Sequence, residues 1–127
     1  MNKEQIIGKL NSFLYGKDSY WVITGAAMVL YGIREQTHDI DLGCTSQLAD
    51  LLEEQGFLYK YMDDGGRWFK IGEDIEVFEN WIEDEIVFLD EIPVLSLKGL
   101  VEMKRKLGRE KDLRDISLIR EYLGKSG

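Results

Sequence analysis

The sequence predicts one α+β domain in which a mixed β-sheet is flanked by helices, with the helices on one face. Two observations favour this class. Apolar residues recur at helical spacing near both ends of the chain, whereas short runs rich in β-branched and aromatic residues fill the region from 57 to 95. The chain has 127 residues, of which 44% are hydrophobic, so we expect a single domain over residues 1–127.

Helices and strands alternate in the first part of the chain. Capping and breaking residues mark the expected boundaries, because Asn, Ser and Thr satisfy the first free N–H groups of a helix and Gly commonly ends one. The expected elements are a helix capped by Asn2 and Gln5 and ended by Gly16, a strand over 20–24, a helix over 26–33, a strand over 38–44, and a helix capped by Thr45 or Ser46 and closed by Gly56.

The second part begins with strands and ends with two helices. The expected strands cover 57–62, 67–71, 75–79, 85–90 and 92–95, and a hairpin turn over 63–66 joins the first two. Ser96 is expected to cap a helix that ends at Gly108, with its apolar residues, Leu107 included, on one side. Asp112 is expected to open a last helix whose inward residues are Leu113, Ile116, Ile119 and Leu123.

Composition excludes several classes of protein. The net charge of −8 argues against general DNA binding, although residues 96–127 carry nine Lys/Arg against five Asp/Glu. Cys44 is the only cysteine, which excludes a disulfide within the chain and a four-cysteine zinc site. The N-terminus has no signal-peptide core, and the most apolar stretch, 21–33, is too short to span a bilayer. We therefore expect a cytoplasmic protein without a membrane partner.

Two similar stretches place acidic residues within strands. In "DIDL" (39–42), Asp39 and Asp41 alternate with aliphatic residues, and in "DIEV" (74–77), Glu76 lies between Ile75 and Val77. Residues two apart in a strand point to the same face. If the two strands are neighbours, the three carboxylates converge, and such a cluster is unstable unless it is protonated or bound to cations. Oxygen ligands suit Mg²⁺, so the cluster predicts the protein half of a phosphoryl-transfer site. Surface-exposed acidic strand edges are the simpler alternative.

A strand that breaks into a helix precedes the first acidic stretch. In "ITGAA" (23–27), Gly25 permits close backbone approach at a helix N-terminus, where free N–H groups favour phosphate. The Trp residues at 21, 68 and 81, together with Phe69, are expected in the core rather than in a base-stacking platform, and exposure of Trp68, beside the 63–66 turn, is the alternative for that residue.

These features, in their order, resemble the nucleotidyltransferase (DNA polymerase β-like) superfamily, and the bacterial lincosamide-nucleotidyltransferase-like and AbiEii-toxin-like proteins are nearest in pattern. "VITGAAMVLYG" is similar to the first motif, "HDIDL" to the second and "IEVF" to the third, and the basic segment 97–119 is similar to one common in such proteins. The match runs from about residue 20 to 119.

The resemblance implies a nucleotidyltransferase-like fold and a Mg²⁺-dependent transfer of a nucleotide from an NTP to a hydroxyl of a small molecule, protein or RNA. It implies Mg²⁺ on Asp39, Asp41 and Glu76, with Glu76 also helping to activate the acceptor. The NTP phosphates would lie near Thr24, Gly25 and Ala26, with Lys104 and Lys111 offsetting their charge.

Ala26 departs from the family pattern, in which Gly or Ser follows the first Gly. A relative that has lost catalysis, such as a binding or toxin–antitoxin-type module, is therefore the alternative function, and a plain α+β domain with acidic surface strands is a third. The acceptor is unknown. Few residues remain to hold it, so a homodimer or a partner protein is expected to complete the site.

Overall fold

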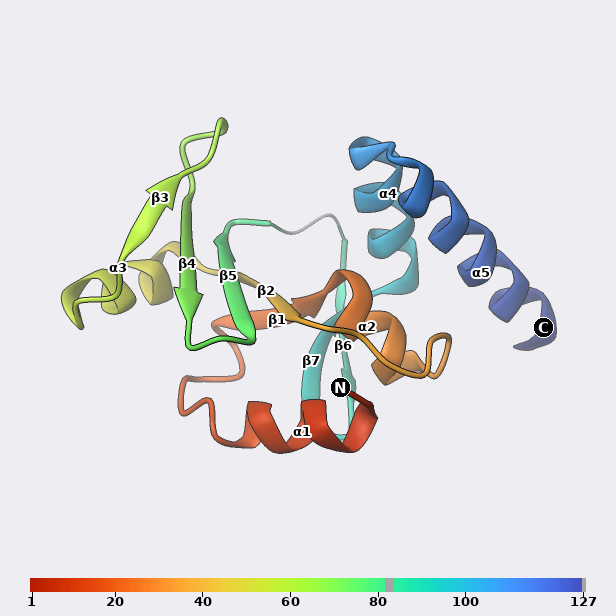
Figure 1. Cartoon of the computed structure of the whole chain (residues 1–127), viewed down its shortest axis with the longest axis horizontal. Coiled ribbons are helices and arrows are strands. Elements are labelled where there is room, and N and C mark those ends of the chain that lie inside the picture. Colours follow the sequence, from red (N-terminus) through yellow and green to blue (C-terminus); the bar gives the residue numbers. More distant parts are fainter. Residues whose placement is uncertain (82–83, 127) are drawn as a thin grey trace.

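The computed structural model describes residues 1–81 and 84–126, and in this part of the chain five helices surround one seven-stranded sheet (Figure 1). The predicted α+β class is confirmed. The elements are α1 (Lys3–Asn11), β1 (Tyr20–Ile23), α2 (Thr24–Tyr31), β2 (Ile40–Cys44), α3 (Ser46–Glu54), β3 (Tyr59–Tyr61), β4 (Arg67–Ile71), β5 (Ile75–Glu79), β6 (Ile86–Leu89), β7 (Ile92–Leu95), α4 (Leu97–Leu107) and α5 (Glu110–Ser126).

The sheet is mixed, in the order β3-β4-β5-β2-β1-β7-β6. Strands β3, β4 and β5 form the expected antiparallel meander, and β6 pairs with β7 as a second antiparallel hairpin at the opposite edge. Two parallel pairs, β2 with β5 and β1 with β7, join these parts to the centre. The acidic strand β2 therefore lies between β5 and β1, in the middle of the sheet.

Helices cover both faces of the sheet, so the expectation of a single covered face is wrong. Glu76 and Glu79 lie three residues apart on β5 and consequently point to opposite faces. Glu79 binds Arg67, which also contacts Asp50 of α3. Glu76 instead lines a cavity together with Lys104 of α4. Helices α3 and α4 therefore lie on opposite faces of the sheet. The face with Glu76 and α4 is the one that carries the acidic residues of the cavity.

The three predicted helix caps are confirmed. Asn2 and Gln5 form a reciprocal capping box on α1. The Thr45 side chain accepts a hydrogen bond from the N–H of Leu48, and the Ser96 side chain accepts one from the N–H of Gly99. Short polar side chains before apolar runs thus locate the starts of α1, α3 and α4.

Packing moves two of the expected helix boundaries. Helix α1 ends at Asn11 instead of continuing to Gly16, since Phe13 turns into the core against Tyr20, with ring centroids 5.0 Å apart, and Leu14 is left 88% exposed. Strand β1 ends at Ile23, one residue earlier than predicted, and α2 begins at Thr24. The first shift arises from the contact of Phe13 with Tyr20, which local sequence pattern does not contain.

The last helix starts at Glu110 and buries fewer apolar residues than predicted. Ile116 and Ile119 are buried, but Leu113 and Leu123 are about half exposed, and Leu107 at the end of α4 is also exposed. In place of leucines, α5 buries the carboxylates of Asp112 and Asp115. The inward face of this helix therefore serves a polar cavity as well as the core.

The aromatic residues divide between core and surface. Trp21 and Phe69 are buried as expected, whereas Trp68 and Trp81 are only half-buried. The lone thiol, Cys44, is buried, and burial raises its pKa to about 12. Within residues 1–81 and 84–126, the structure contains no helix with the length and apolar character needed to cross a membrane.

Gly43 on β2 provides a test of this packing. A Cβ atom at this position would lie 2.1 Å from Nε1 of Trp21 and 2.5 Å from the carbonyl oxygen of Trp81, which are themselves hydrogen-bonded at 2.6 Å. We expect Gly43→Ala to lower the free energy of unfolding by about 1–3 kcal/mol or more, because overpacking of a dense core displaces its neighbours. Urea denaturation of the variant measures this loss.

Gly8→Ala is the matched control, since a Cβ there meets nothing within 4 Å and the residue lies in α1. This control should raise stability by up to about 1 kcal/mol through helix propensity. Equal stability of the Gly43→Ala variant and the parent would contradict the packing described around Trp21.

Candidate functional site

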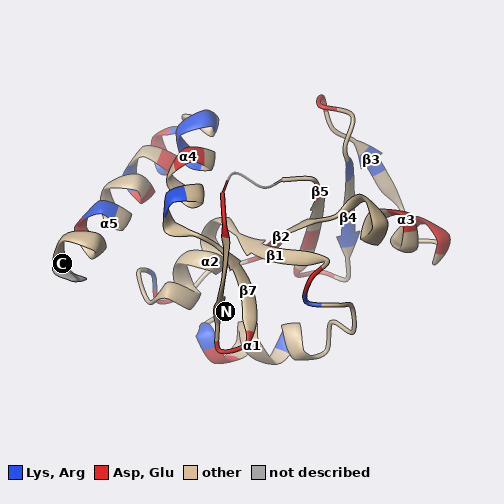
Figure 2. Cartoon of the chain, turned by 180° about the vertical axis from the view of Figure 1, so that it is seen from behind, with Lys and Arg blue, Asp and Glu red and all other residues tan. Residues whose placement is uncertain are grey.

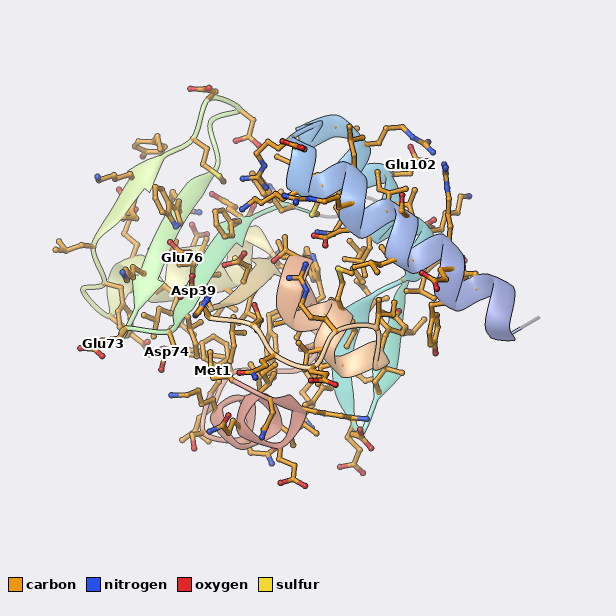
Figure 3. The ribbon with its side chains drawn as sticks, turned by 45° about the vertical axis from the view of Figure 1, so that its right-hand side comes forward. Met1, Asp39, Glu73, Asp74, Glu76 and Glu102 are labelled. Atoms are coloured by element: carbon orange, nitrogen blue, oxygen red, sulfur yellow. The ribbon has the colours of Figure 1, made fainter. Side chains whose placement is uncertain are left out.

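The acidic residues of the two similar stretches meet at the centre of the sheet. Strands β2 and β5 are parallel neighbours, and Asp41 is the direct cross-strand partner of Glu76. Side chains of such partners lie on the same face and close together. Asp39 precedes β2 by one residue and is exposed, and Figure 3 shows it close to Glu76. The convergence expected from the alternation of "DIDL" and "DIEV" is thus found for Asp41 and Glu76, whereas Asp39 lies outside the strand and lines the same cavity.

A polar cavity of about 380 Å³ surrounds these carboxylates. It is built from the β1–α2 turn, the segment before β2, strands β2 and β5, and the junction of α4 with α5. The lining residues are Thr24, Gly25, Arg34, Thr37, His38, Asp39, Asp41, Glu76, Lys104, Arg109, Lys111, Asp112 and Asp115. Acidic groups on the sheet therefore face basic groups that come mainly from the C-terminal helices, where Figure 2 shows Lys and Arg on α4 and α5.

Asp41 is the most perturbed carboxylate of the cavity. Its pKa is raised to about 6, mainly by burial and in addition by the negative charges of Glu76 and Asp39, which together outweigh the lowering by the Thr24 hydrogen bond. The Thr24 hydroxyl donates to Oδ2 at 2.8 Å, but Oδ1 is buried and finds no hydrogen-bond partner among the described residues. A buried carboxylate oxygen without a donor is costly, and a bound cation would remove that cost.

Thr24 is held in a strained backbone conformation. Its φ of 54° lies in the left-handed region, which a β-branched residue rarely adopts. Such strain persists where the surroundings enforce it, often at functional sites. Here it connects β1 directly to α2 and directs the hydroxyl towards Asp41. The turn also leaves Gly25 lining the cavity at the first turn of the helix.

Ala26 does not belong to the cavity. Its side chain is fully buried in the core and does not line the cavity, so neither a methyl group nor a hydroxyl at this position would reach a ligand there. The two residues that the turn presents to the cavity are Thr24 and Gly25. The departure from the family pattern at Ala26 therefore removes no cavity-facing group.

The basic groups are arranged around two buried carboxylates. Lys104 Nζ lies 3.0 Å from Asp115 Oδ2, and Arg34 binds the other oxygen of Asp115. Arg109 Nε lies 2.6 Å from Asp112 Oδ2, and this hydrogen bond raises the pKa of Arg109 and helps to lower that of Asp112. These ion pairs connect α4 and α5 to each other and to the segment after α2.

Lys111 is exposed, like Arg109, but it differs from Arg34, Lys104 and Arg109 because it has no ion-pair partner within the described part of the chain. Of the residues predicted for nucleotide binding, Thr24, Gly25, Lys104 and Lys111 line the cavity, and Lys104 is almost completely buried there. Sequence analysis missed Arg34, Thr37 and Arg109, which also line it. Arg34 and Thr37 lie just before "HDIDL" in the sequence, and this proximity to the acidic motif was the signal that could have identified them as cavity residues.

The carboxylates that line the cavity fit a divalent cation. Asp41 offers an unpaired oxygen, and Glu76 lies directly across from it. No group of three or more His, Cys, Asp or Glu side chains in residues 1–81 and 84–126 is arranged to hold a metal. Magnesium commonly takes only one or two protein carboxylates, and water and phosphate oxygens complete its shell. The carboxylate pair therefore fits Mg²⁺ in the presence of a phosphate ligand.

Comparison with solved structures identifies a similar fold. A candidate nucleotidyltransferase from Thermotoga maritima superposes with a TM-score of 0.62 at 17% sequence identity, covering 98% of this chain and 96% of that one. No family model and no curated protein matches the sequence. The chain thus has a nucleotidyltransferase-like fold.

Asp41→Asn tests the carboxylate cluster without any ligand. The folded-state pKa of about 6 exceeds the ordinary value of 3.8. The parent therefore loses stability as the pH rises from about 4 to about 6, and this stability stays lost at higher pH. The Asn variant keeps an acceptor for Thr24 but carries no charge. We expect it to be more stable than the parent at pH 8, by at most about 3 kcal/mol, and the difference to disappear below about pH 4.

Thermal or urea unfolding of both proteins between pH 4 and pH 8 measures the difference. Asp63→Asn, in the exposed turn between β3 and β4, is the control and should leave stability nearly unchanged at each pH. A stability difference between the Asp41→Asn variant and the parent that is independent of pH would show that Asp41 is not perturbed in this way.

Proposed function

We propose that the protein catalyses Mg²⁺-dependent transfer of a nucleoside monophosphate from an NTP to a hydroxyl group. The observation that carries this proposal is the cross-strand pair Asp41 and Glu76, which lies in one cavity with the Thr24–Gly25 turn and several basic side chains. Carboxylates that bind a cation, next to groups that bind phosphate, are what phosphoryl transfer requires. The nucleotidyltransferase-like fold supports the same reaction class.

The phosphates would bind at the start of α2. This helix has eight residues, its first N–H groups have no partner within the helix, and its dipole favours negative charge. Gly25 lets the phosphate approach the backbone closely. Lys111, Arg109 and Arg34 line the same cavity and would offset the charge of the triphosphate.

Asp41, with Glu76 or Asp39, would hold the cation. When bound, Mg²⁺ supplies positive charge that offsets the charge on the phosphate oxygens. Glu76 would accept the proton of the acceptor hydroxyl. The acceptor oxygen then bonds to the α-phosphorus, the bond from this phosphorus to its bridging oxygen breaks, and pyrophosphate leaves.

The alternative is a module that binds nucleotide without transferring it. It is favoured by the lack, in the described residues, of a three-ligand metal group. The two functions differ in product rather than in binding. A relative without catalysis would bind NTP at the α2 turn but release it unchanged.

Ligand binding should stabilise the fold if the proposed site is correct. At a hundredfold excess of ligand over its dissociation constant, the free energy of unfolding rises by about 2.7 kcal/mol. We expect millimolar Mg²⁺ with an NTP to raise the melting temperature of the parent but not that of the Asp41→Asn variant. We expect Glu76→Gln to retain most of the stabilisation while losing labelled-nucleotide transfer by at least a hundredfold.

Asp63→Asn again serves as the control and should behave as the parent in both assays. A melting temperature unmoved by Mg²⁺ and NTP would rule out the nucleotide site. Stabilisation without transfer to any of a panel of hydroxyl compounds would favour the binding module.

Lys111→Ala tests the phosphate end of the cavity. Because a hydrogen bond to a charged group contributes about 1.5–3 kcal/mol, we expect NTP affinity to fall by about tenfold or more. Lys98→Ala is the control. Lys98 lies in α4, is 82% exposed and does not line the cavity, so its removal should leave the NTP affinity within about twofold of the parent's. Calorimetric titration with an NTP measures both. Equal affinities of the two variants would remove Lys111 from the site.

A further inference from the structure

Three aromatic rings form a stack beside the carboxylates. Trp68 on β4 and Phe78 on β5 are cross-strand partners whose ring centroids lie 5.9 Å apart with an interplanar angle of 7°. Trp81 covers the other side of the array, with its ring centroid 4.6 Å from that of Phe78 at an angle of 21°. We call Trp68, Phe78 and Trp81 the ring stack.

The ring stack is not a conventional part of the core. All three residues are only half-buried, whereas Phe69, the neighbour of Trp68 on the opposite face, is completely buried. The indole nitrogen of Trp68 is itself buried and has no acceptor among the described residues. The partly exposed, nearly parallel rings are a surface on which a further flat ring can bind.

The stack continues the face that carries the catalytic carboxylates. Phe78 follows Glu76 by two residues on β5, so their side chains share a face about 7 Å apart. The phosphate-binding turn follows β1, on the far side of β2 from β5. At the level of Glu76 the order across the sheet is therefore phosphate turn, Asp41, Glu76 and then Lys70 of β4, the cross-strand partner of Glu76. The ring stack begins two residues further along β5, where Phe78 pairs with Trp68. A hydroxyl compound that reaches Glu76 from that end of β5 meets the ring stack.

Specific contacts hold Trp81 in its position. Trp21 donates its indole N–H to the Trp81 carbonyl oxygen at 2.6 Å, and only a glycine at position 43 leaves room for this contact. Trp81 also lines a second cavity of about 250 Å³, whose other wall is the end of α4 with Met103 and Leu107.

This second cavity adjoins the catalytic one. Lys104, next to Met103 on α4, lines the cavity of the carboxylates. In Figures 1 and 2 the β3–β4 hairpin and the α4–α5 pair lie on opposite sides of β5. The second cavity is lined from both of these sides, by Asp64 of the hairpin turn and by Leu107 of α4, so a ligand in it would contact Trp81 of the ring stack.

We propose that the ring stack is the acceptor subsite, and that it binds a flat unsaturated ring attached to the hydroxyl that receives the nucleotide. This inference rests on the proposed function for the role of the hydroxyl, but ring binding itself does not require catalysis. A saturated sugar or an aliphatic alcohol lacks the flat face that stacking requires. Flat rings attached to hydroxyls occur both in nucleosides and in phenols, and both kinds of probe are needed.

Ring binding is measured first, without NTP. The full chain is titrated with adenosine, with N-acetyltyrosinamide, and with ribose and cyclohexanol as saturated controls, and tryptophan fluorescence is recorded. We expect at least one ring compound to quench the fluorescence saturably and the saturated compounds not to do so. The responding compound identifies whether the ring is a nucleobase or a phenol.

Variants then locate the binding. Trp81→Leu should weaken binding of the ring compound by about tenfold or more, Trp81→Phe should restore most of it, and Phe88→Leu, at the exposed edge strand β6, should change nothing. In transfer assays, the Trp81→Leu substitution should raise the KM for the acceptor while leaving the KM for NTP within about twofold. A general structural defect would change both KM values, so a change in the KM for the acceptor alone would place the effect at the acceptor subsite.

Failure of the inference and failure of the proposed function give different results. Ring binding that depends on Trp81, without NTP binding or transfer, would retain the subsite and overturn the reaction. Transfer that is insensitive to Trp81→Leu, or equal responses to flat and saturated compounds, would overturn the subsite and leave the reaction standing.

Discussion

The placement of Asp41 directly opposite Glu76 on two parallel strands is the constraint on which the site depends. Two carboxylates so close together repel, and one of them is largely buried. The structure offsets this repulsion only in part, through the Thr24 hydroxyl and the basic residues across the cavity. Such an arrangement lowers the stability of the protein, and the cation proposed above would offset this cost.

The surrounding elements are arranged around that pair. The strained backbone at Thr24 brings a hydroxyl to Asp41 and begins α2 at the cavity. The buried carboxylate of Asp115 holds Lys104 and Arg34, so that the C-terminal helices close over the face that the sheet leaves polar. The pair of Lys104 with Asp115 is buried, and the cost of removing two charges from water offsets much of their attraction. The contribution of these ion pairs is to orient positive charge towards the carboxylates.

The molecule separates two kinds of surface on one face of its sheet. Charged groups lie at one end of this face, with Asp41, Glu76 and Lys70, and aromatic rings lie further along β4 and β5, with Trp68 and Phe78. Because side chains two apart on β5 share a face, a single strand carries both Glu76 and Phe78. The proposed transfer from a charged donor to a ring-bearing acceptor would place the reacting atoms at the boundary between these two groups.

The sequence by itself determined the α+β class, the existence of every strand, and the caps at Asn2, Thr45 and Ser96, since these depend on local periodicity and on local hydrogen bonds. It also indicated that "DIDL" and "DIEV" belong together, because alternation within a strand decides which side chains share a face. Tertiary structure alone decided that Ala26 is core, that α1 stops at Asn11, and that Arg34 and Arg109 join the cavity. These outcomes depend on contacts between residues far apart in the chain, such as Arg34 with Asp115, and no local pattern encodes such contacts.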